Sequence, residues 1–326
     1  MAEARYAAAL NRALADSMQA DASVVLFGED VAAPGGPFAV TRGLLAKFGP
    51  ERVRDTPISE AAIAGTAVGA ALSGLKPVVE IMFMDFMTLA MDALVNQAAK
   101  AHFMFGGQCS VPMVVRTPHG GGLNAGPQHS QCLEAWFAHV PGLKVVVPAT
   151  PADAYALLRA AIDDPDPVIF VEHKGLYSSK GELPDAPQPV AIGSARIARH
   201  GRDCTVATYG ACVALALRAA QALGAEGTEV EVIDLRTVQP WDERAVLASV
   251  ARTRRLVVAH EAVSAFGVGA EIAARVSEKA FGQLAAPVLR VGAPFMPVPF
   301  ARALERGFLP GEEAIAAAVR RALAAS

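Results

Sequence analysis

The chain has 326 residues, of which 53% are hydrophobic and 19% charged, and its formal net charge is −3. This composition excludes a disordered protein, and the near balance of acidic and basic residues gives no reason to expect nucleic acid or an anionic membrane surface as a partner. The length is too great for one small core and predicts two domains.

Short β-branched runs alternate with alanine-rich stretches along the first half of the chain. The first helix is expected near the start, with Tyr6, Leu10 and Leu14 on one face. Because strands that alternate with helices form parallel sheets, this half predicts an α/β domain. The expected elements are strands at residues 24–27, 77–81, 113–116, 144–147 and 168–171, and helices at residues 61–72, 87–102 and 151–162.

The pattern is interrupted between Ser178 and Pro189, where three prolines and several polar residues are typical of a linker. Beyond it the alternation resumes, with strands at residues 204–210, 230–235, 256–260 and 287–291 and a helix at residues 214–223. The predicted fold class is therefore α/β with two parallel-sheet domains. Their expected bounds are residues 1–180 and 194–326, joined by a linker at residues 181–193.

The four cysteines form no Cys-x-x-Cys pair, which is typical of a reducing compartment. The first residues show no signal-peptide pattern, and no window contains 18 consecutive apolar residues. From these observations we expect a soluble cytoplasmic protein without a targeting segment or a transmembrane helix.

Several common catalytic patterns are missing from the sequence. It contains no Gly-x-Gly-x-x-Gly after a strand, no phosphate-binding loop ending in Gly-Lys-Ser/Thr and no Gly-x-Ser-x-Gly. His119, His129 and His139 are ten residues apart, a spacing that argues against a catalytic zinc site. The apolar stripe at residues 82–87 is by itself more typical of a core than of a ligand pocket.

Two candidate catalytic residues lie in loop-like contexts. His129 follows a glycine-rich run at residues 120–126, and a histidine at such a place can carry a proton near neutral pH. Glu60 ends the segment Asp-Thr-Pro-Ile-Ser-Glu at residues 55–60 and precedes an alanine-rich helix. A local hydrogen bond for His129 and a helix N-terminal position for Glu60 are the structural alternatives.

Taken together, the motifs resemble the β subunit of the thiamine-diphosphate-dependent dehydrogenase component of 2-oxo acid dehydrogenase complexes. They occur in the order of that family and cover nearly the whole chain. Such subunits have a pyrimidine-binding domain followed by a transketolase C-terminal-type domain. The matching segments are residues 27–31, 55–60, 128–131, 141–146, 166–169 and 232–237.

The resemblance implies a role for four of the residues. Glu60 would hydrogen-bond the ring nitrogen N1′ of the aminopyrimidine of thiamine diphosphate, and Met82 and Phe86 would pack against that ring. His129 would give or take a proton when the acyl group is transferred to the lipoyl disulfide, or it would stabilise the intermediates. The cofactor itself would supply the carbanion chemistry and the electron sink.

The resemblance also implies that the cofactor site is incomplete in this chain. Gly28-Glu29-Asp30 is present, but the Gly-Asp-Gly motif and the following Asn that hold Mg²⁺ and the diphosphate are not. An α subunit would supply them in an α2β2 heterotetramer, and a lipoyl-bearing acyltransferase core would be a further partner. A potassium site known in such subunits would match Met113, Ala161, Ile162, Asp164 and Asp166.

Three substrate classes stay open within the family. The segments 96–107, 172–178 and 294–300 resemble the acetoin branch, whereas pyruvate and branched-chain 2-oxo acid enzymes share most of the remainder. A transketolase-like half enzyme is a more distant alternative and would need basic residues for a sugar phosphate. A non-catalytic assembly subunit is another, but a scaffold would have no use for Glu60 and His129.

Overall fold

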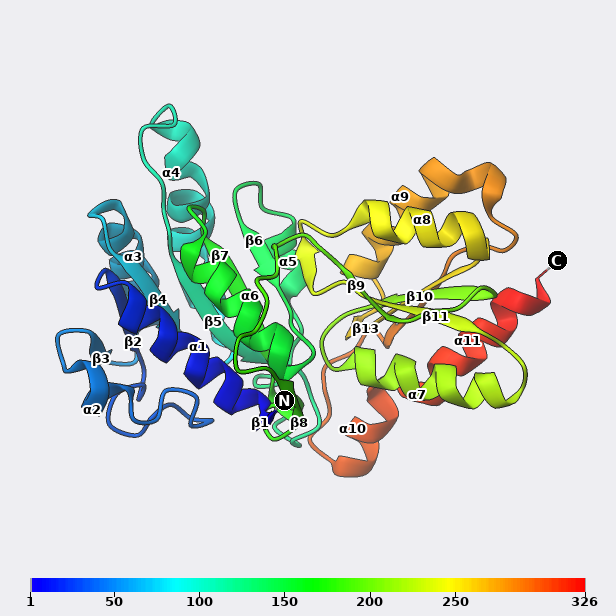
Figure 1. Ribbon diagram of the computed structural model, residues 1–326, viewed down its shortest axis with the longest axis horizontal. Helices are drawn as coiled ribbons and strands as arrows, with labels where there is room; N and C mark the ends of the chain where they lie inside the picture. Colours follow the sequence, from blue (N-terminus) through cyan, green and yellow to red (C-terminus); the bar gives the residue numbers. More distant parts are fainter. Residues whose placement is uncertain (1, 326) are drawn as a thin grey trace. The chain divides into compact units, whose positions relative to one another are not determined.

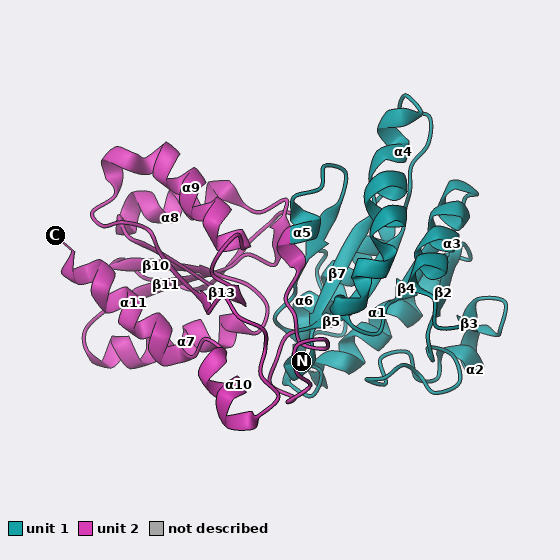
Figure 2. Ribbon diagram, turned by 180° about the vertical axis from the view of Figure 1, so that it is seen from behind, with its two compact units in different colours: residues 1–119, 136–192 teal, residues 120–135, 193–326 magenta. Residues whose placement is uncertain are grey.

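A computed structural model describes residues 2–325. It divides the chain into two compact units (Figure 2). Unit 1 comprises residues 1–119 and 136–192, and unit 2 comprises residues 120–135 and 193–326. The glycine-rich segment of residues 120–135 is therefore part of unit 2, although the chain on both sides of it belongs to unit 1.

Unit 1 contains a parallel sheet in the order β6-β7-β5-β4-β2-β3. All side chains of β5 and β7 are buried, as expected for strands covered on both faces. The strands are β2 (Val24–Gly28), β3 (Val53–Asp55), β4 (Lys76–Glu80), β5 (Val114–His119), β6 (Lys144–Val146) and β7 (Val168–His173).

The helices of unit 1 cover this sheet (Figure 1). The first, α1, packs on α6 and buries Tyr6, Leu10 and Leu14 in one core cluster with Leu26 and Phe170 of the strands. The sequence predicted this face. The helices are α1 (Tyr6–Ala20), α2 (Leu44–Phe48), α3 (Glu60–Leu72), α4 (Ala99–Met104) and α6 (Pro151–Asp163), with the 3₁₀ segments η1 (Met84–Ala90) and η3 (Lys174–Leu176) and the π segment η2 (Ala93–Ala98).

Two predictions about local structure in unit 1 differ from what is observed. The single helix expected at residues 87–102 is a succession of 3₁₀, π and α segments, because apolar periodicity does not specify which carbonyl each N–H bonds. The segment interpreted as a linker begins with β8 (Lys180–Leu183), which pairs antiparallel with β1 (Ala2–Arg5).

Unit 2 is built around a sheet in the order β14-β13-β10-β11-β9, in which only β9 is antiparallel to its neighbour. Helices α7 and α11 lie on one side of it, and α8 and α9 on the other (Figure 1). The strands of this sheet are β9 (Arg196–Arg199), β10 (Cys204–Thr208), β11 (Val230–Asp234), β13 (Leu256–Val263) and β14 (Leu289–Ala293). The short strand β12 (Thr237–Gln239) of the same unit lies outside this sheet.

The helices of unit 2 enclose its core, to which α7 and α11 contribute Ala216, Leu223, Ile315 and Val319. The two sheets and their helices confirm the α/β fold with two parallel-sheet domains. The helices are α7 (Cys212–Ala225), α8 (Glu243–Thr253), α9 (Val268–Ala280), α10 (Arg302–Phe308) and α11 (Glu312–Ala324), with the 3₁₀ turn η4 (Phe281–Gln283); α5 (Glu134–Ala138) begins in unit 2 and ends in unit 1.

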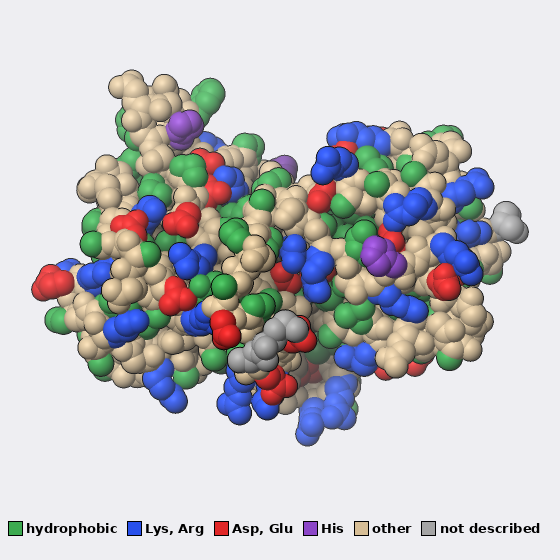
Figure 3. Space-filling view, in the orientation of Figure 1, with side chains coloured by type: hydrophobic (Ala, Val, Ile, Leu, Met, Phe, Trp, Pro, Cys, Tyr) green, Lys and Arg blue, Asp and Glu red, His purple; other side chains and the backbone are tan. Residues whose placement is uncertain are grey.

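The surface agrees with the small net charge. On the face drawn in Figure 3, acidic and basic side chains are interspersed within each unit. Among the helices that the structure describes, none is both long enough and apolar enough to cross a membrane.

Candidate functional site

Glu60 lies at the edge of the unit 1 sheet where the parallel strands end. It is the first residue of α3, and its exposed fraction is 5%. Gly28, Asp55 and Glu80 are the paired last residues of β2, β3 and β4. Because ligands of open α/β sheets bind beyond the carboxyl ends of the strands, Glu60 is at the edge where a ligand is expected.

Hydrogen bonds hold the turn that precedes Glu60. The Asp55 carboxylate accepts the backbone N–H of Ala32 at 2.6 Å. The N–H of Thr56 donates to the carbonyl of Gly28 at 2.9 Å. These bonds tie the end of β3 to the end of β2, so the start of α3 is fixed to the sheet.

Gly28 allows β2 and β4 to end close together. A Cβ at this position would lie 2.5 Å from the carbonyl oxygen of Glu80, and the φ angle of Gly28 is +156°. Only glycine accommodates this approach without a shift of the backbone. The next residue, Glu29, follows the end of β2 and has an exposed fraction of 5%.

Glu29 and Glu60 are both buried, and the charge of Glu60 acts on the carboxyl group of Glu29. Burial raises the pKa of Glu29, and the charges of Glu60 and Asp30 raise it further. Its Oε1 atom is buried without a hydrogen-bond partner among residues 2–325. A carboxyl group whose pKa is raised by burial and by a nearby negative charge holds a proton more readily, and that proton can then be exchanged with a ligand nitrogen.

The expected apolar residues follow β4 in the same unit. Met82 and Phe86 are both half-buried. The ring of Phe86 meets that of Phe83 edge to face, with centroids 5.8 Å apart. Phe86 belongs to η1, which packs against α3, the helix that starts with Glu60.

These residues fit a flat heterocycle that carries a ring nitrogen. Glu29 offers a carboxyl oxygen that lacks a hydrogen bond, and Met82 and Phe86 offer half-buried apolar side chains. An apolar wall with a few polar groups that converge is the usual construction of a ligand site. Unit 1 therefore fits the aminopyrimidine half of thiamine diphosphate.

His129 lies in unit 2, whereas Glu60 lies in unit 1. Its side chain is half-buried, and its backbone N–H donates to the carbonyl of Gly126 at 3.4 Å. This bond closes a turn at the end of the glycine-rich run. The imidazole therefore belongs to a short turn within residues 120–135, the part of unit 2 that interrupts unit 1 along the chain.

A cavity of about 460 Å³ lies next to this turn within unit 2. Its lining combines apolar rings with the polar residues that follow His129 in the chain. The hydroxyl oxygen of Ser130 is buried there without a hydrogen-bond partner among the described residues. The lining includes Ser130, Gln131, Cys132, Glu261, Phe295 and Phe308.

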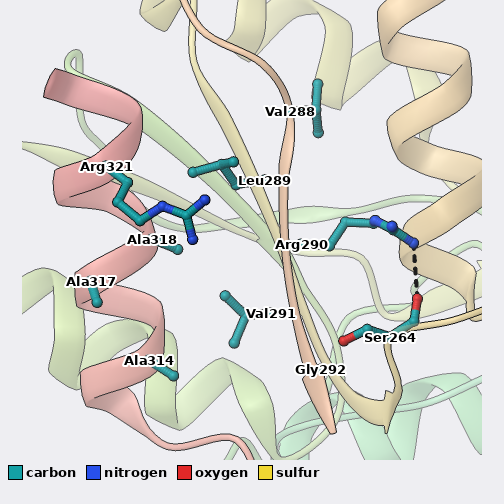
Figure 4. A pocket seen from close by; sticks show the side chains of 10 residues that line it. All are labelled: Ser264, Val288, Leu289, Arg290, Val291, Gly292, Ala314, Ala317, Ala318 and Arg321. Carbon is teal, nitrogen blue, oxygen red and sulfur yellow. Dashed lines mark hydrogen bonds between the residues drawn. The ribbon is translucent and has the colours of Figure 1, made fainter. Parts of the chain in front are cut away.

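A second cavity of unit 2, of about 480 Å³, lies between β14 and α11 (Figure 4). Its apolar lining is flanked by Arg290 and Arg321, and Arg290 donates to the carbonyl of Ser264 at 2.9 Å. It shares no lining residue with the first cavity and includes no carboxyl group, so it is not suited to the chemistry implied for Glu60 and His129.

A buried ion cluster joins three strands of unit 1. Arg116 of β5 is 1% exposed and donates to Glu80 at 2.6 Å and to both oxygens of Glu172 at 2.7 and 2.8 Å. The hydroxyl of Tyr177 donates to Glu172 at 2.7 Å. Burial raises the pKa of Glu80 even though the charge of Arg116 lowers it. This cluster fixes the strand end on which Gly28 rests.

The carboxylates expected near a potassium ion already have a cationic partner. The ammonium group of Lys144 lies 2.6 Å from Asp164 and 3.0 Å from Asp166. The carbonyl of Met113 accepts the N–H of Val168 at 2.9 Å within the sheet. An ion here would therefore be held by backbone carbonyl groups.

Residues 2–180 match the transketolase pyrimidine-binding domain, and residues 193–315 match the transketolase C-terminal domain. The chain belongs to the transketolase-like family of dehydrogenase β subunits. This confirms the resemblance found in the sequence, and it supports thiamine diphosphate as the cofactor and an oxidoreductase as the class of enzyme.

Two relatives illustrate the similarity. The β-2 subunit of the mitochondrial pyruvate dehydrogenase E1 component from Oryza sativa is 48% identical over 96% of this chain and 85% of the relative. The β subunit of acetoin:2,6-dichlorophenolindophenol oxidoreductase from Cupriavidus necator is 46% identical over 97% of this chain and 96% of the relative.

Solved structures show the same fold. A split gene transketolase, an inactive beta4 tetramer, has a TM-score of 0.80 and is 24% identical over 97% of each chain. At this identity the similarity concerns the fold alone.

Sequence reasoning did not find two groups of this site. Glu29 entered only as part of a family motif, and Arg116 was assigned no role. A signal for Glu29 was present, since it follows a buried strand at the edge where Glu60 begins a helix. The Arg116 cluster gave no signal, because its partners are 36 and 56 residues away.

Proposed function

We propose that this chain is the β subunit of a thiamine-diphosphate-dependent dehydrogenase that cleaves acetoin or decarboxylates a 2-oxo acid and transfers the acyl group to lipoamide. The observation that carries the proposal is the buried Glu29–Glu60 pair at the carboxyl edge of the unit 1 sheet. The full-length similarity to β subunits of pyruvate and acetoin dehydrogenases supports it.

Glu60 would hold the aminopyrimidine through its ring nitrogen. Glu29 would keep a proton available nearby, since burial raises the pKa of its carboxyl group. Met82 and Phe86 would provide the apolar wall of the ring and exclude water from it. When bound, the cofactor supplies a nucleophilic carbon and an electron sink.

His129 would donate or accept a proton during acyl transfer to the lipoyl disulfide. A histidine suits this task because its ordinary pKa range lies near neutral pH. The adjoining cavity of unit 2, which is lined by the rings of Phe295 and Phe308 and by Ser130 and Gln131, has a lining compatible with an acyl or lipoyl group.

An α subunit would complete the enzyme. Since the sequence has no Gly-Asp-Gly motif, the groups that bind Mg²⁺ and the diphosphate would come from that partner. We propose an α2β2 heterotetramer that works with a lipoyl-bearing acyltransferase core. The pyrimidine-binding function would reside in residues 1–180 and the transketolase C-terminal type of domain in residues 194–326.

The relatives do not decide between acetoin and pyruvate as the substrate. The pyruvate dehydrogenase subunit is 48% identical to this chain and the acetoin oxidoreductase subunit 46%. A difference of one methylene group between two substrates changes their discrimination by a pocket by only about 1–3 kcal/mol. We propose acetoin first, on the segments that resemble the acetoin branch, with pyruvate and branched-chain 2-oxo acids as the substrates to be compared.

Potassium is a separate proposal. The backbone carbonyl groups of Met113, Ala161 and Ile162 would hold it, since the nearby carboxylates are paired with Lys144. The unfolding midpoint of the protein would then be higher in a potassium salt than in a lithium salt of equal ionic strength. Equal midpoints would contradict a potassium site here.

The central test uses the chain with its α partner, thiamine diphosphate and Mg²⁺. Cleavage of acetoin, pyruvate and branched-chain 2-oxo acids is measured with an artificial electron acceptor. Glu60→Gln is expected to lower the rate by at least about a hundredfold, as for the loss of a general acid–base group. Glu51→Gln is the matched control, because the Glu51 side chain is 89% exposed in the same unit.

Cofactor binding is measured on the same samples by calorimetry. Weaker binding of thiamine diphosphate to Glu60→Gln, with normal binding to the control, supports direct contact with the cofactor. A wild-type complex that assembles and binds the cofactor but turns over none of the substrates refutes the dehydrogenase assignment.

A further inference from the structure

The glycine-rich run before His129 is held by two carboxylates from distant parts of unit 2. Glu261 of β13 accepts the backbone N–H of Gly121 at 2.6 Å. Glu305 of α10 accepts the N–H of Gly122 with one oxygen and the N–H of Asn124 with the other, each at 3.0 Å. Three backbone donors of one short run thus point at two side chains.

The conformation of the run suits this arrangement. Gly122 has a φ angle of +92° and Asn124 one of +56°, both in the left-handed region. Left-handed residues turn neighbouring N–H groups to the same side and form a concavity that binds anions. Here the anion is the carboxylate of Glu305, which is 2% exposed, and buried charge-assisted bonds of this kind are strong.

Close packing accompanies the hydrogen bonds. A Cβ at Gly121 would lie 2.9 Å from Cδ2 of Leu309, the residue that follows α10. A Cβ at Gly126 would lie 2.1 Å from the ring of Phe300, and the φ angle of Gly126 is +73°. The backbone of the run therefore lies directly on the segment that contains Glu305.

The run ends at the turn that carries His129. The N–H of His129 donates to the carbonyl of Gly126, so the imidazole starts from a backbone whose preceding residues are bound to Glu305 and Glu261. A glycine-rich run has high conformational freedom when it is not held. The place of the imidazole consequently depends on these carboxylates.

We propose that Glu305, assisted by Glu261, is a positioning residue that holds the glycine-rich run and thereby fixes His129 for acyl transfer. This inference rests on the proposed function of His129. A misplacement of a reacting group by about 1 Å lowers rates up to about a hundredfold. A purely structural role of Glu305 would instead lower stability and leave the contribution of His129 intact.

The test is a double-mutant cycle of Glu305→Gln and His129→Ala in the complex with the α partner. The amide of glutamine retains one acceptor oxygen and places a donor against the other N–H. Two rates are measured: substrate cleavage with an artificial electron acceptor, and acyl transfer to lipoamide. Glu313→Gln is the control, since Glu313 is exposed on α11 of the same unit.

Glu305→Gln is expected to lower acyl transfer by about tenfold to a hundredfold, and cleavage by less than about threefold. In the His129→Ala background it is expected to lower transfer no further, because the residue it positions is gone. The inference is overturned if Glu305→Gln lowers acyl transfer by the same factor with His129 and with His129→Ala. It is also overturned if Glu305→Gln does not lower acyl transfer in the protein that retains His129.

Hydrogen exchange of residues 120–126 gives a readout independent of activity. Glu305→Gln is expected to speed exchange in this run, and unchanged exchange overturns the inference. If the Glu305→Gln chain does not assemble with the α partner, Glu305→Asp takes its place in the double-mutant cycle. Aspartate keeps the carboxylate but has a side chain that is shorter by one methylene group. If the His129→Ala complex transfers the acyl group at the normal rate, the proposed role of His129 fails together with this inference. If His129→Ala loses acyl transfer but Glu305→Gln does not, only the positioning role of Glu305 is refuted.

Discussion

Replacing Arg116 with methionine removes the guanidinium that lies between Glu80 and Glu172. The change deletes three charge-assisted hydrogen bonds and leaves the carboxyl groups of Glu80 and Glu172 buried without their cationic partner. Removal of one partner from a buried ion pair costs about 3–5 kcal/mol, because the remaining charge is buried without compensation. We expect the free energy of unfolding of unit 1 to fall by about this amount.

The loss should depend on pH. Burial already raises the pKa of Glu80, and removal of the Arg116 charge takes away the main influence that lowers it. The folded variant then binds a proton more tightly than the unfolded chain. Its stability is therefore retained at pH values below the ordinary carboxyl range and lost as pH rises through the raised pKa. The difference from the wild type should be larger at pH 8 than at pH 5.

Guanidinium chloride unfolding followed by tryptophan fluorescence measures this effect. The Trp241→Phe background removes the tryptophan of unit 2, so that Trp136 reports on unit 1. Arg116→Lys keeps the charge but not the forked geometry and should lose less stability. Arg54→Met is the control, because it breaks an exposed ion pair worth less than about 1 kcal/mol.

A further variant separates buried charge from packing. Replacing Glu80 and Glu172 with glutamine in the Arg116→Met protein removes both uncompensated charges. It should recover part of the lost stability at pH 8. A loss below about 1 kcal/mol for Arg116→Met, or a loss that is the same at pH 5 and pH 8, would refute the reasoning.

Three other changes test the neighbouring geometry. Gly28→Ala places a Cβ 2.5 Å from the carbonyl oxygen of Glu80 and should lower both the unfolding midpoint and the affinity for thiamine diphosphate; normal values in both assays would contradict the close approach. Glu29→Gln removes a carboxyl group whose pKa is raised by burial, so the stability of the variant relative to the wild type should increase from pH 4 to pH 8. Unfolding curves at a series of pH values measure this difference, and a decrease would contradict a raised pKa of Glu29. Lys144→Ala leaves Asp164 without its partner and should cost about 1 kcal/mol or less, with a loss that shrinks in high salt; an effect independent of salt would speak against an ionic origin.

Much of the fold follows from local patterns. The faces of the helices, shown by Tyr6, Leu10 and Leu14 in α1, follow from apolar residues at helical spacing. The β-branched runs became the parallel strands, since such side chains fit a buried sheet. Glu60 at the start of α3 was also visible from the residues around it.

Other features needed the tertiary structure. The sequence does not show that Glu29 lies beside Glu60, that β1 pairs with β8, or that the run before His129 is bound by Glu305, which is about 180 residues away. Periodicity and turn residues are local properties and can be read along the chain. A hydrogen bond or a pair of neighbouring charges between distant residues exists only once the backbone has brought them together, and no local spacing encodes it.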